Sequence, residues 1–444
     1  MRKTCKYLII GNSAGGIAAA EAIRRTDKHG PVMIVSDEPY HAYSRPLISK
    51  YLAGRCTVED MLFRPADFYG KNGIETVLDA IAARLDVAGR TVELADGDSF
   101  AFEKLLLAVG GKPIVPPIRD MGSDDLITFT KLDDAKRIKE AVASGARRVV
   151  VVGGGLIGMS VTEALVGLGL EVTVVELKDR VLSLALDKTC SQIVENTLRE
   201  NGVTVLTGQS VTGIAKAKDT GRVKAAILSN GQEVACDLVI LAIGVVPRSD
   251  LAAGTGMATN RGIVVDQHMK TSLDNIYACG DVAEASDVLL GANRVLPIWP
   301  SAYIGGRVAG LNMTGASTEY PGWVSHNSFN YFGLSIVSAG TVEPEDAKGY
   351  EISVWSDRDS YHKVVLKDNR IVGMALSGDI QRAGILFNLM REKMSVERFK
   401  GSLLTPGFGL VSLPAEVREQ MLSRPGISDM CLALLKQPEL ALAR

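Results

Sequence analysis

Two glycine-rich stretches have the residue types and spacing that can hold phosphate groups. The clearer one, residues 153–158, matches the pattern G-x-G-x-x-G and follows four valines, residues 149–152. An apolar run of helix length comes next, and a second β-branched run ends at Glu176. This order predicts a β-α-β unit whose first strand is buried on both faces. In such a unit the glycines permit a tight turn, a close approach of the backbone to a pyrophosphate, and tight packing of helix on strand.

The helix and the acidic residue of this unit add to the prediction. A helix that begins beside the glycines presents unpaired N–H groups and the positive end of its dipole to phosphates. Glu176 stands where a carboxylate would bind ribose hydroxyls and repel a 2′-phosphate, which favours NADH over NADPH, although Lys178 and Arg180 are nearby cations. An ordinary tight turn is the alternative, but all parts of the unit agree on dinucleotide binding. The residues expected to contact NAD(H) are Gly153, Gly155, Leu156, Ile157, Gly158 and Glu176.

A second copy of this pattern stands near the N-terminus. Residues 7–10 read as a strand and residues 17–25 as an alanine-rich helix, with the glycines between them. Ser13 replaces the middle glycine, and its small side chain keeps a close approach possible while its hydroxyl could donate to a phosphate. Two copies predict two nucleotides, one held permanently and one exchanged. The residues of this copy expected to contact a nucleotide are Gly11, Ser13, Ala14, Gly15 and Gly16.

Length and composition limit the remaining possibilities. A chain of 444 residues is too long for one core, so two to four domains are expected. The net charge of −2 gives no sign of nucleic-acid binding, and no membrane span is needed. Residues 1–20 superficially resemble a signal peptide, but their apolar run is interrupted at residues 11–13. Six scattered cysteines and five histidines show no metal-ligand spacing, so we expect no metal site and mostly inert thiols in a reducing cytoplasm.

Further motifs carry a family resemblance. Asp37-Glu38-Pro39 precedes the run YSRPLISK at residues 43–50, residues 105–110 read LLLAVG, residues 238–244 read LVILAIG, and residues 276–283 read IYACGDVA. Together with the two glycine patterns, these motifs resemble the FAD-dependent pyridine nucleotide–disulfide oxidoreductases. Within that family the chain is most similar to the branch of ferredoxin reductases, rubredoxin reductases and apoptosis-inducing factor. The resemblance covers about residues 5–320.

The resemblance implies an α/β fold with two Rossmann-like (three-layer ββα) dinucleotide-binding domains, the NAD domain inserted in the FAD domain, plus an α+β C-terminal domain. Its implied boundaries are 1–115 for the first FAD segment, 116–243 for the NAD domain, 244–320 for the second FAD segment and 321–444 for a C-terminal interface domain.

Roles for individual residues follow from the same resemblance. Asp37 would bind the adenosine ribose of FAD, and Asp281 would accept hydrogen bonds from its ribityl chain. Arg45 would lie along the nucleotide. Lys50 would act catalytically beside flavin N5, where a cation stabilises the reduced flavin; solvated loop charges are the alternative for both cations. Trp299 would lie near the flavin or pack in the core. Further implied FAD contacts are Glu38, Ala108, Gly110, Gly244 and Gly280.

The chain departs from the family pattern at several positions. Ser44 lies close to the place where disulfide- and peroxide-reducing relatives carry a redox cysteine, and Cys56 is the only nearby thiol, so dithiol chemistry is disfavoured. Ser160 stands where many relatives carry a glutamate that pairs with the flavin-side lysine, and Glu163 is one turn away. Lys50 would then lack its partner, which would raise the flavin's reduction potential.

The C-terminal part resembles the family's interface domain only loosely. It lacks the acid–base histidine pattern of disulfide reductases, so His326 and His362 are interpreted as structural. We expect strands at 334–337, 363–366 and 371–374, a helix at 382–392, and one or two amphipathic helices after Pro414. A basic cluster could receive an acidic electron carrier, although a solvated helix face is favoured. That cluster is Arg391, Lys393, Arg398 and Lys400.

The resulting hypothesis is an FAD-dependent oxidoreductase that passes electrons between NADH and a protein carrier. That carrier would be ferredoxin, rubredoxin or an iron–sulfur subunit, and the protein could form a homodimer or a hetero-complex. Three alternatives remain open: the NAD-linked flavin subunit of a larger complex that oxidises aldehydes, 2-oxo acids or CO, an NADH oxidase, and a non-catalytic NADH-sensing flavoprotein.

Overall fold

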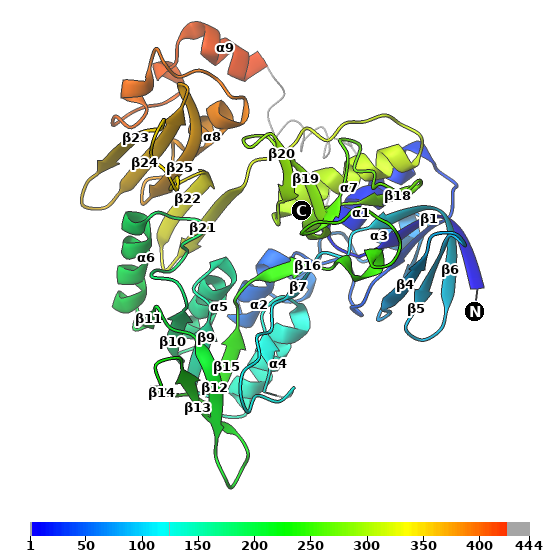
Figure 1. Ribbon diagram of the computed structural model, residues 1–444, viewed down its shortest axis with the longest axis horizontal. Helices are drawn as coiled ribbons and strands as arrows, with labels where there is room; N and C mark the ends of the chain where they lie inside the picture. The colour runs from blue at the N-terminus through cyan, green and yellow to red at the C-terminus, as the bar shows by residue number, and fades with distance from the viewer. Residues whose placement is uncertain (1, 124, 424–444) are drawn as a thin grey trace. The chain divides into compact units, whose positions relative to one another are not determined.

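The computed structural model describes residues 2–123 and 125–423 (Figure 1). They divide into two compact units. The first unit comprises Met1–Leu184, Ser191–Ser325 and Tyr331–Gly333. The second comprises Ala185–Cys190, His326–Asn330 and Leu334–Arg444. Both glycine patterns therefore belong to the first unit. No helix in the described part of the chain is both long enough and apolar enough to cross a bilayer.

The outer sheet of the first unit has seven strands, in the order β3-β2-β1-β6-β5-β4, with β18 also paired to β6. Parallel pairing joins β1 to both β2 and β6, with Leu8 opposite Met33 and Leu105. The first three residues of β6 pair with β5, and its last three residues pair with β18, which comes from far along the chain. The strands are β1 (Arg2–Ile10), β2 (Val32–Val35), β3 (Ile74–Val77), β4 (Ala82–Asp86), β5 (Thr91–Leu94), β6 (Ser99–Leu107) and β18 (Ile276–Ala278).

The insert sheet of the first unit has five parallel strands, in the order β11-β10-β9-β15-β8. Its central strand β9 carries the four valines, all buried, as expected for a parallel strand covered on both faces. A three-stranded antiparallel sheet, β12-β13-β14, accompanies it. The strands are β8 (Ile127–Thr128), β9 (Arg148–Val152), β10 (Glu171–Glu176), β11 (Thr204–Thr207), β12 (Val211–Lys216), β13 (Val223–Leu228), β14 (Glu233–Ala235) and β15 (Leu238–Leu241).

Two short strands mark where the chain leaves the part of the first unit built on the seven-stranded sheet, called the outer part, and where it returns to that part. The segment between these two strands, which contains the five-stranded parallel sheet, is called the insert. Strands β7 (Gly111–Pro113) and β16 (Val245–Pro247) pair antiparallel, with Lys112 opposite Val246. Pro116 and Pro117 follow β7, and neither has an N–H to donate to a further ladder. After the return, β17 (Ile263–Val264), β19 (Ala283–Asp287) and β20 (Ala292–Val295) form a small sheet.

The helices lie between these strands. Helices α1 and α7 pack against each other, and α2 packs against both α4 and α5. Helix α4 precedes the second glycine pattern. The helices are α1 (Ala14–Thr26), α2 (Ile48–Leu52), α3 (Phe68–Lys71), α4 (Leu132–Ala143), α5 (Leu156–Gly167), α6 (Lys188–Glu200), α7 (Trp299–Met313), α8 (Ala383–Arg391) and α9 (Ala415–Ser423).

The second unit is built on a five-stranded sheet in the order β21-β22-β25-β24-β23. The predicted strands and the predicted helix, now α8, are all present. Helix α9 begins directly after Pro414, and the rest of the expected tail lies outside the described residues. The strands are β21 (His326–Tyr331), β22 (Leu334–Gly340), β23 (Glu351–Ser356), β24 (Tyr361–Lys367) and β25 (Arg370–Ser377).

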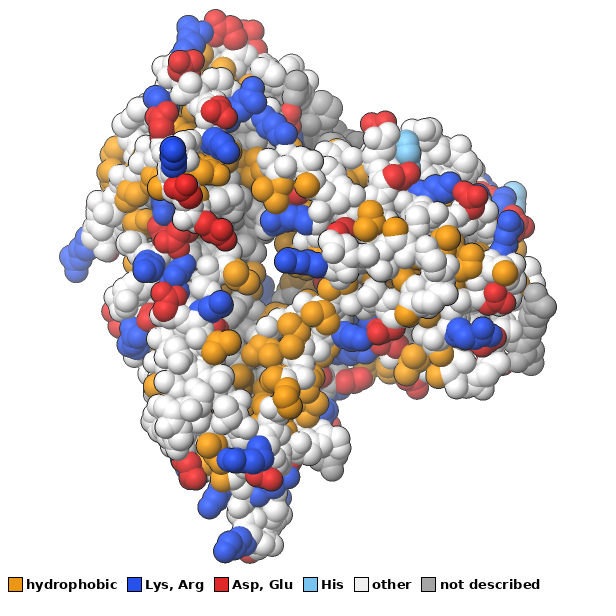
Figure 2. All heavy atoms as spheres, in the orientation of Figure 1, with side chains coloured by type: hydrophobic (Ala, Val, Ile, Leu, Met, Phe, Trp, Pro, Cys, Tyr) orange, Lys and Arg blue, Asp and Glu red, His pale blue; other side chains and the backbone are white. Residues whose placement is uncertain are grey.

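Charged side chains of both signs are interspersed over the face shown in Figure 2, which agrees with the small net charge. The basic cluster of the second unit follows the same pattern. Arg391 pairs with Glu392 at 2.6 Å, and Lys400 pairs with Glu351 at 2.6 Å. Acidic neighbours therefore offset these two charges, and since the Arg391 side chain is only 15% exposed, the cluster is a solvated face only in part.

Candidate functional site

The first glycine loop connects β1 to α1 in a conformation that only glycine adopts easily. Gly11 has a φ of +122°, and a Cβ there would overlap the carbonyl oxygen of Ala108. A Cβ at Gly16 would overlap the carbonyl oxygen of Gly11. Ser13 is the extended N-cap of α1, and its side chain makes no capping hydrogen bond. Its hydroxyl is therefore available to a ligand at the helix N-terminus.

Helix α7 and the end of β18 enclose this loop. A Cβ at Gly306 of α7 would overlap the carbonyl oxygen of Gly15, and a Cβ at Gly15 would lie 2.6 Å from Cys279 Sγ. Gly280, with a φ of +74°, follows at the end of β18. Burial raises the pKa of the Cys279 thiol to about 12, so this cysteine is an inert packing residue, as predicted. The GD pair of the IYACGDVA motif thus stands beside the first glycine loop.

Asp281, the acidic residue of that motif, has a side chain without a protein partner. Within the described residues no hydrogen bond or ion pair reaches its carboxylate. Burial raises the pKa of Asp281, and the positive charge of Arg45 opposes that rise. A half-buried carboxylate is costly unless it accepts hydrogen bonds. Ligand hydroxyls would supply them, so this position fits the sugar-alcohol chain of a flavin nucleotide.

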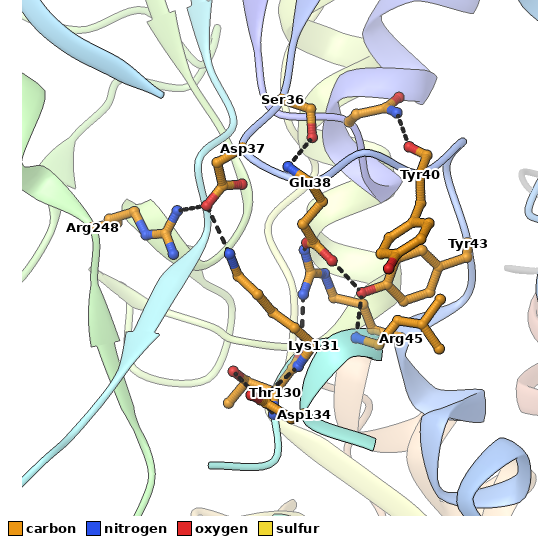
Figure 3. A network of polar contacts seen from close by, with 12 residues as sticks. Ser36, Asp37, Glu38, Tyr40, Tyr43, Arg45, Thr130, Lys131, Asp134 and Arg248 are labelled. Carbon is orange, nitrogen blue, oxygen red and sulfur yellow. Dashed lines mark hydrogen bonds and ion pairs between the residues drawn. The ribbon is translucent and has the colours of Figure 1, made fainter. Parts of the chain in front are cut away.

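Asp37, at the end of the turn after β2, is held by two cations (Figure 3). Lys131 Nζ lies 2.8 Å and Arg248 Nη1 lies 2.7 Å from the same carboxylate oxygen, Oδ2. The other oxygen, Oδ1, accepts no hydrogen bond from the residues that the structure describes. Burial alone would raise the pKa of Asp37, but these two hydrogen bonds lower it to about 2. An ionised carboxylate with one free oxygen suits the hydroxyls of an adenosine ribose.

The neighbouring acid, Glu38, has a different environment. It is buried, and its two oxygens are used by Tyr43, which donates at 2.7 Å, and by the Arg45 guanidinium. Arg45 also donates to the carbonyl oxygen of Thr130 at 2.9 Å. The structure therefore places these two predicted nucleotide contacts within a network of the protein's own groups.

Lys50 lies on the exposed side of α2. It has no ion pair among the described residues. Ser160, on the adjacent α5, donates to the carbonyl oxygen of Leu156 at 2.9 Å, and Glu163 accepts from the backbone N–H of Phe332 at 3.2 Å. Neither side chain neutralises the lysine. This arrangement agrees with the expectation that Lys50 lacks the acidic partner found in many relatives.

The second glycine loop, between β9 and α5, has one open side. Gly153 has a φ of +108°, and a Cβ at Gly158 would overlap the carbonyl oxygen of Gly153. Gly155, in contrast, has no atom within 4 Å of the position of an added Cβ. This opening stands beside the N-terminus of α5, where Leu156 and Ile157 are the first helical residues. A pyrophosphate could approach the helix there.

Glu176 ends β10 and contacts the same loop. It accepts hydrogen bonds from the backbone N–H groups of Gly154 at 2.6 Å and of Lys178 at 2.8 Å. Nearby Arg180 pairs with Asp179 at 3.0 Å. Glu176 therefore stands beside the glycine loop, as the sequence predicted. The charge of Arg180, which could favour a 2′-phosphate, is offset by Asp179.

The predicted turn residues lie where the chain crosses between the two sheets. Ala108 donates its backbone N–H to Ile10 at 2.8 Å, which sets the turn after β6 against β1. Gly110 and Gly244 both have positive φ values, of 68° and 107°. Ile114 donates to the carbonyl oxygen of Gly244 at 3.0 Å, so the two crossings are hydrogen-bonded to each other.

Trp299 is the first residue of α7 and is half-buried. Its ring meets Phe63 edge to face, with centroids 5.0 Å apart. The guanidinium of Arg64 lies 4.2 Å from the Phe63 ring centroid. These contacts show an aromatic packing role, and they leave part of the indole accessible.

The remaining candidate redox and acid–base groups are isolated. The described cysteines are all free, and the part of the chain that the structure describes contains no cluster of metal-ligating side chains. His362 is buried, stacks on Trp355, and has its Nε2 2.6 Å from the carbonyl oxygen of Asp379. Burial lowers the pKa of His362. This agrees with a structural role.

Two site residues, Lys131 and Arg248, were missed from the sequence. Lys131 occupies the N-cap of α4, a position that usually holds Ser, Thr, Asp or Asn. That unusual choice was the signal that could have marked it. Arg248 directly follows β16, and its position at the return crossing was a weaker signal.

Comparisons with known proteins agree with this geometry. A family model described as pyridine nucleotide-disulphide oxidoreductase matches residues 5–306, which is more than half of the chain. A second, described as rubredoxin NAD+ reductase C-terminal domain, matches residues 326–394. The second match gives the C-terminal part a more specific relationship than its loose resemblance suggested.

Individual relatives lead to the same family. The epsilon subunit of NADH-dependent phenylglyoxylate dehydrogenase from Aromatoleum evansii is 34% identical over 338 residues, or 76% of this chain and 79% of that protein. Rubredoxin-NAD(+) reductase from Pseudomonas putida is 31% identical over 315 residues, or 71% of this chain and 81% of that protein. The crystal structure of NADH:rubredoxin oxidoreductase from Clostridium acetobutylicum has a TM-score of 0.75 at 26% identity, and covers 90% of this chain and 98% of that chain.

The expected family, fold class and cofactor pair are thus confirmed. The chain belongs to the pyridine nucleotide-disulphide oxidoreductase family and is an FAD-dependent NADH oxidoreductase.

Proposed function

We propose that this protein moves electrons between NADH and a small iron–sulfur protein of the rubredoxin or ferredoxin type. A bound flavin accepts a hydride from NADH and can release its two electrons one at a time, which connects a two-electron donor to one-electron carriers. The observation that carries the proposal is Ser44, close to where disulfide- and peroxide-reducing relatives carry a cysteine. A serine hydroxyl cannot form a disulfide or a reversible sulfenate, so the electrons must leave the flavin for an external acceptor.

The residues have distinct parts in this proposal. For FAD, the loop Gly11–Gly16 and Ser13 would hold the phosphates, Asp37 Oδ1 would accept from the adenosine ribose, and Asp281 would accept from the ribityl chain. Lys50 would supply the positive charge that favours the reduced flavin.

For NADH, Gly155 and the first N–H groups of α5 would hold the pyrophosphate, and Glu176 would select against a 2′-phosphate. Residues 1–115 and 244–320 would then bind FAD, residues 116–243 would bind NADH, and residues 321–444 would form an interface domain. We also place the protein in the cytoplasm, which the free thiols of the described cysteines support.

An anaerobic titration tests this proposal. NADH, then NADPH, is added to the purified protein while the visible absorbance of the flavin is followed. One equivalent of NADH per chain should bleach the flavin rapidly, and oxidised rubredoxin or ferredoxin should then restore the colour. Consumption of a second equivalent would reveal another redox centre, and failure of NADH to reduce the flavin would contradict the proposal.

A second function is favoured by one specific observation. The relative from Aromatoleum evansii is named as a subunit of an NADH-dependent phenylglyoxylate dehydrogenase. The chain described here would then be the NAD-linked flavin subunit of a complex that oxidises a 2-oxo acid. Purification from its native source at low salt distinguishes the two. A defined complex that reduces NAD+ with a 2-oxo acid supports the subunit, whereas a free chain that turns over rapidly with an added carrier supports the reductase.

A further inference from the structure

A buried hydrogen-bond relay joins helix α4 to the loop that follows β2 (Figure 3). Tyr43 accepts a hydrogen bond from the backbone N–H of Leu132 at 3.0 Å and donates one to Glu38 at 2.7 Å. Tyr43 and Glu38 are both buried. The N–H of Leu132 is one of the groups at a helix N-terminus that have no partner inside the helix. A residue of the outer part of the first unit thus caps a helix of the insert.

Arg45 makes a second connection beside the first. Its guanidinium pairs with Glu38 and also donates to the carbonyl oxygen of Thr130 at 2.9 Å, just before α4 begins. One carboxylate, Glu38, therefore orients both the hydroxyl and the guanidinium that reach the insert. Removal of either partner would leave a buried polar group unsatisfied, which costs about 1–3 kcal/mol.

The same two segments are also joined at Asp37. Lys131, at the N-cap of α4, and Arg248, at the return crossing, share its Oδ2 atom. The backbone N–H groups of Thr130 and Lys131 are held by Asp134 at 2.7 Å and 3.0 Å. The start of α4 is therefore fixed internally and fixed again to the loop between β2 and α2.

These connections matter because the chain enters and leaves the insert at the two crossings, β7 and β16, so that all other contacts with the rest of the unit are non-covalent. Tyr40 adds to them by hydrogen-bonding Asp133 and Lys136 of α4. Hydride transfer requires reacting atoms about 3–3.5 Å apart, and a misplacement of about 1 Å can cost roughly a hundredfold in rate. Short crossing strands can act as a hinge, so contacts away from the hinge must define the angle of the insert.

We propose that Tyr43 and Arg45 are positioning residues that fix the insert against the FAD-side loop and so determine how fast NADH reduces the flavin. This inference rests on the function proposed above, and it gives Arg45 a positioning role in addition to its predicted contact with the nucleotide. Neither residue needs to touch the reacting atoms. Their effect passes through α4 and through α2, which packs against α4 and carries Lys50.

The chain offers a matched control for Tyr43. Tyr69 also accepts a backbone N–H, from Ala42 at 3.0 Å, and donates to a side chain, Asn12, at 2.7 Å. It is buried as well, and its partners are Ala42 and Asn12 of the first glycine loop, neither of which belongs to the insert. Tyr43→Phe and Tyr69→Phe therefore remove the same atom from the same kind of relay, and of the two only Tyr43→Phe removes a direct hydrogen bond to α4.

The experiment is stopped-flow reduction of the flavin by a range of NADH concentrations, with the rate normalised to bound FAD. In Tyr43→Phe the limiting rate should fall about ten- to a hundredfold, while the apparent Kd for NADH and the rate of reduction by dithionite stay within about twofold. Tyr69→Phe removes a hydrogen bond to Asn12 of the first glycine loop, so it should lower the FAD content at most and keep the wild-type limiting rate per bound FAD. Arg45→Lys keeps a cation beside Glu38 but cannot donate to both Glu38 and the carbonyl oxygen of Thr130, so its limiting rate should also fall. This variant tests the inference if Tyr43→Phe does not fold.

Three outcomes are distinguishable. A selective loss of the limiting rate in the Tyr43 and Arg45 variants supports the inference. If the limiting rates of Tyr43→Phe, Tyr69→Phe and wild type are equal, the inference is overturned and the proposed function stands. The same conclusion follows if Tyr43→Phe loses FAD but reduces its remaining flavin at the wild-type rate. A wild-type protein that NADH cannot reduce overturns both.

Discussion

The carboxylate of Glu176 accepts a hydrogen bond from the backbone N–H of Gly154, with 2.6 Å between the oxygen and the nitrogen. The acid that is expected to choose between NADH and NADPH therefore also braces the loop that is expected to hold the pyrophosphate. The choice between NADH and NADPH and the geometry of the second glycine loop thus both depend on the Glu176 side chain. Different substitutions of Glu176 can separate these two effects.

Glu176→Gln should lower the preference for NADH over NADPH, measured as the ratio of kcat/KM values, by about ten- to a hundredfold, because the amide no longer repels a 2′-phosphate. Its single amide oxygen can still accept from Gly154, although the hydrogen bond from Lys178 is then lost, so the loop contact remains and the kcat with NADH should change little. Glu176→Ala also removes the hydrogen bond to the backbone of Gly154, so it should raise the KM for NADH as well. If the ratio of kcat/KM values for NADH and NADPH is unchanged in both variants, the Glu176 carboxylate does not contact the ribose.

Two glycines of one motif should respond differently to alanine. Gly155→Ala adds a methyl group to open space, so the protein should keep its wild-type thermal stability while the KM for NADH rises tenfold or more. Gly158→Ala places a Cβ against the Gly153 carbonyl oxygen and should destabilise the fold by about 1–3 kcal/mol. Thermal unfolding and NADH titration of both variants provide the check. Normal NADH binding by Gly155→Ala would place the pyrophosphate elsewhere.

Asp281→Asn should stabilise the flavin-free protein and weaken its affinity for FAD. Because the folded state raises the pKa of Asp281 above its ordinary value, the ionised carboxylate opposes folding at neutral pH. The stability difference from wild type should be largest near pH 7, should shrink as the pH falls through the raised folded-state pKa, and should reach its minimum below about pH 3, where the carboxyl is protonated in both states. Melting temperatures of the flavin-free proteins across this range, with FAD affinity measured by flavin fluorescence, test both parts. A less stable variant at pH 7 would show that the carboxylate has a stabilising partner.

Ser160→Glu should lower the midpoint potential of the flavin. The substitution restores, on α5 beside α2, the acid that many relatives pair with the flavin-side lysine, and so removes net positive charge near the oxidised–reduced couple. Ser160→Gln, which has the same shape without the charge, is the control and should leave the potential unchanged. Dye-linked reductive titration measures both, and equal potentials in the two variants would mean that Lys50 does not act on the flavin.

Much of the fold around the two glycine loops can be predicted from local sequence patterns. Buried valine runs, glycine spacing and the acid at the end of β10 are features of neighbouring residues, so the sequence predicted both glycine loops and the placement of Glu176. The contact between Lys131 and Asp37 joins positions 94 residues apart, and that between Arg248 and Asp37 spans 211. No periodicity encodes such pairs, because they arise only when the two crossings are brought together.

The two acids after β2 illustrate a finer limit. Asp37 and Glu38 are adjacent, and the motif alone suggested that both would face a nucleotide. In the structure Asp37 keeps one free oxygen, whereas Glu38 is buried and fully used by Tyr43 and Arg45. Which of two neighbouring carboxylates turns inward depends on the cations that the rest of the fold supplies, and these come from distant parts of the chain.

The close contact of Gly306 with Gly15 has a consequence for biosynthesis. A ribosome releases the whole insert sheet, which ends at Leu241, before it has made β18 or α7. We infer that the nascent chain folds the insert first and keeps the N-terminal glycine loop without its neighbours until residue 306 has emerged. Nascent chains stalled near residue 280 should protect the insert from protease yet retain no flavin, and flavin retention at that length would contradict this order. The beginning of the chain is therefore synthesised before the insert but gains its last neighbours only after the insert is complete.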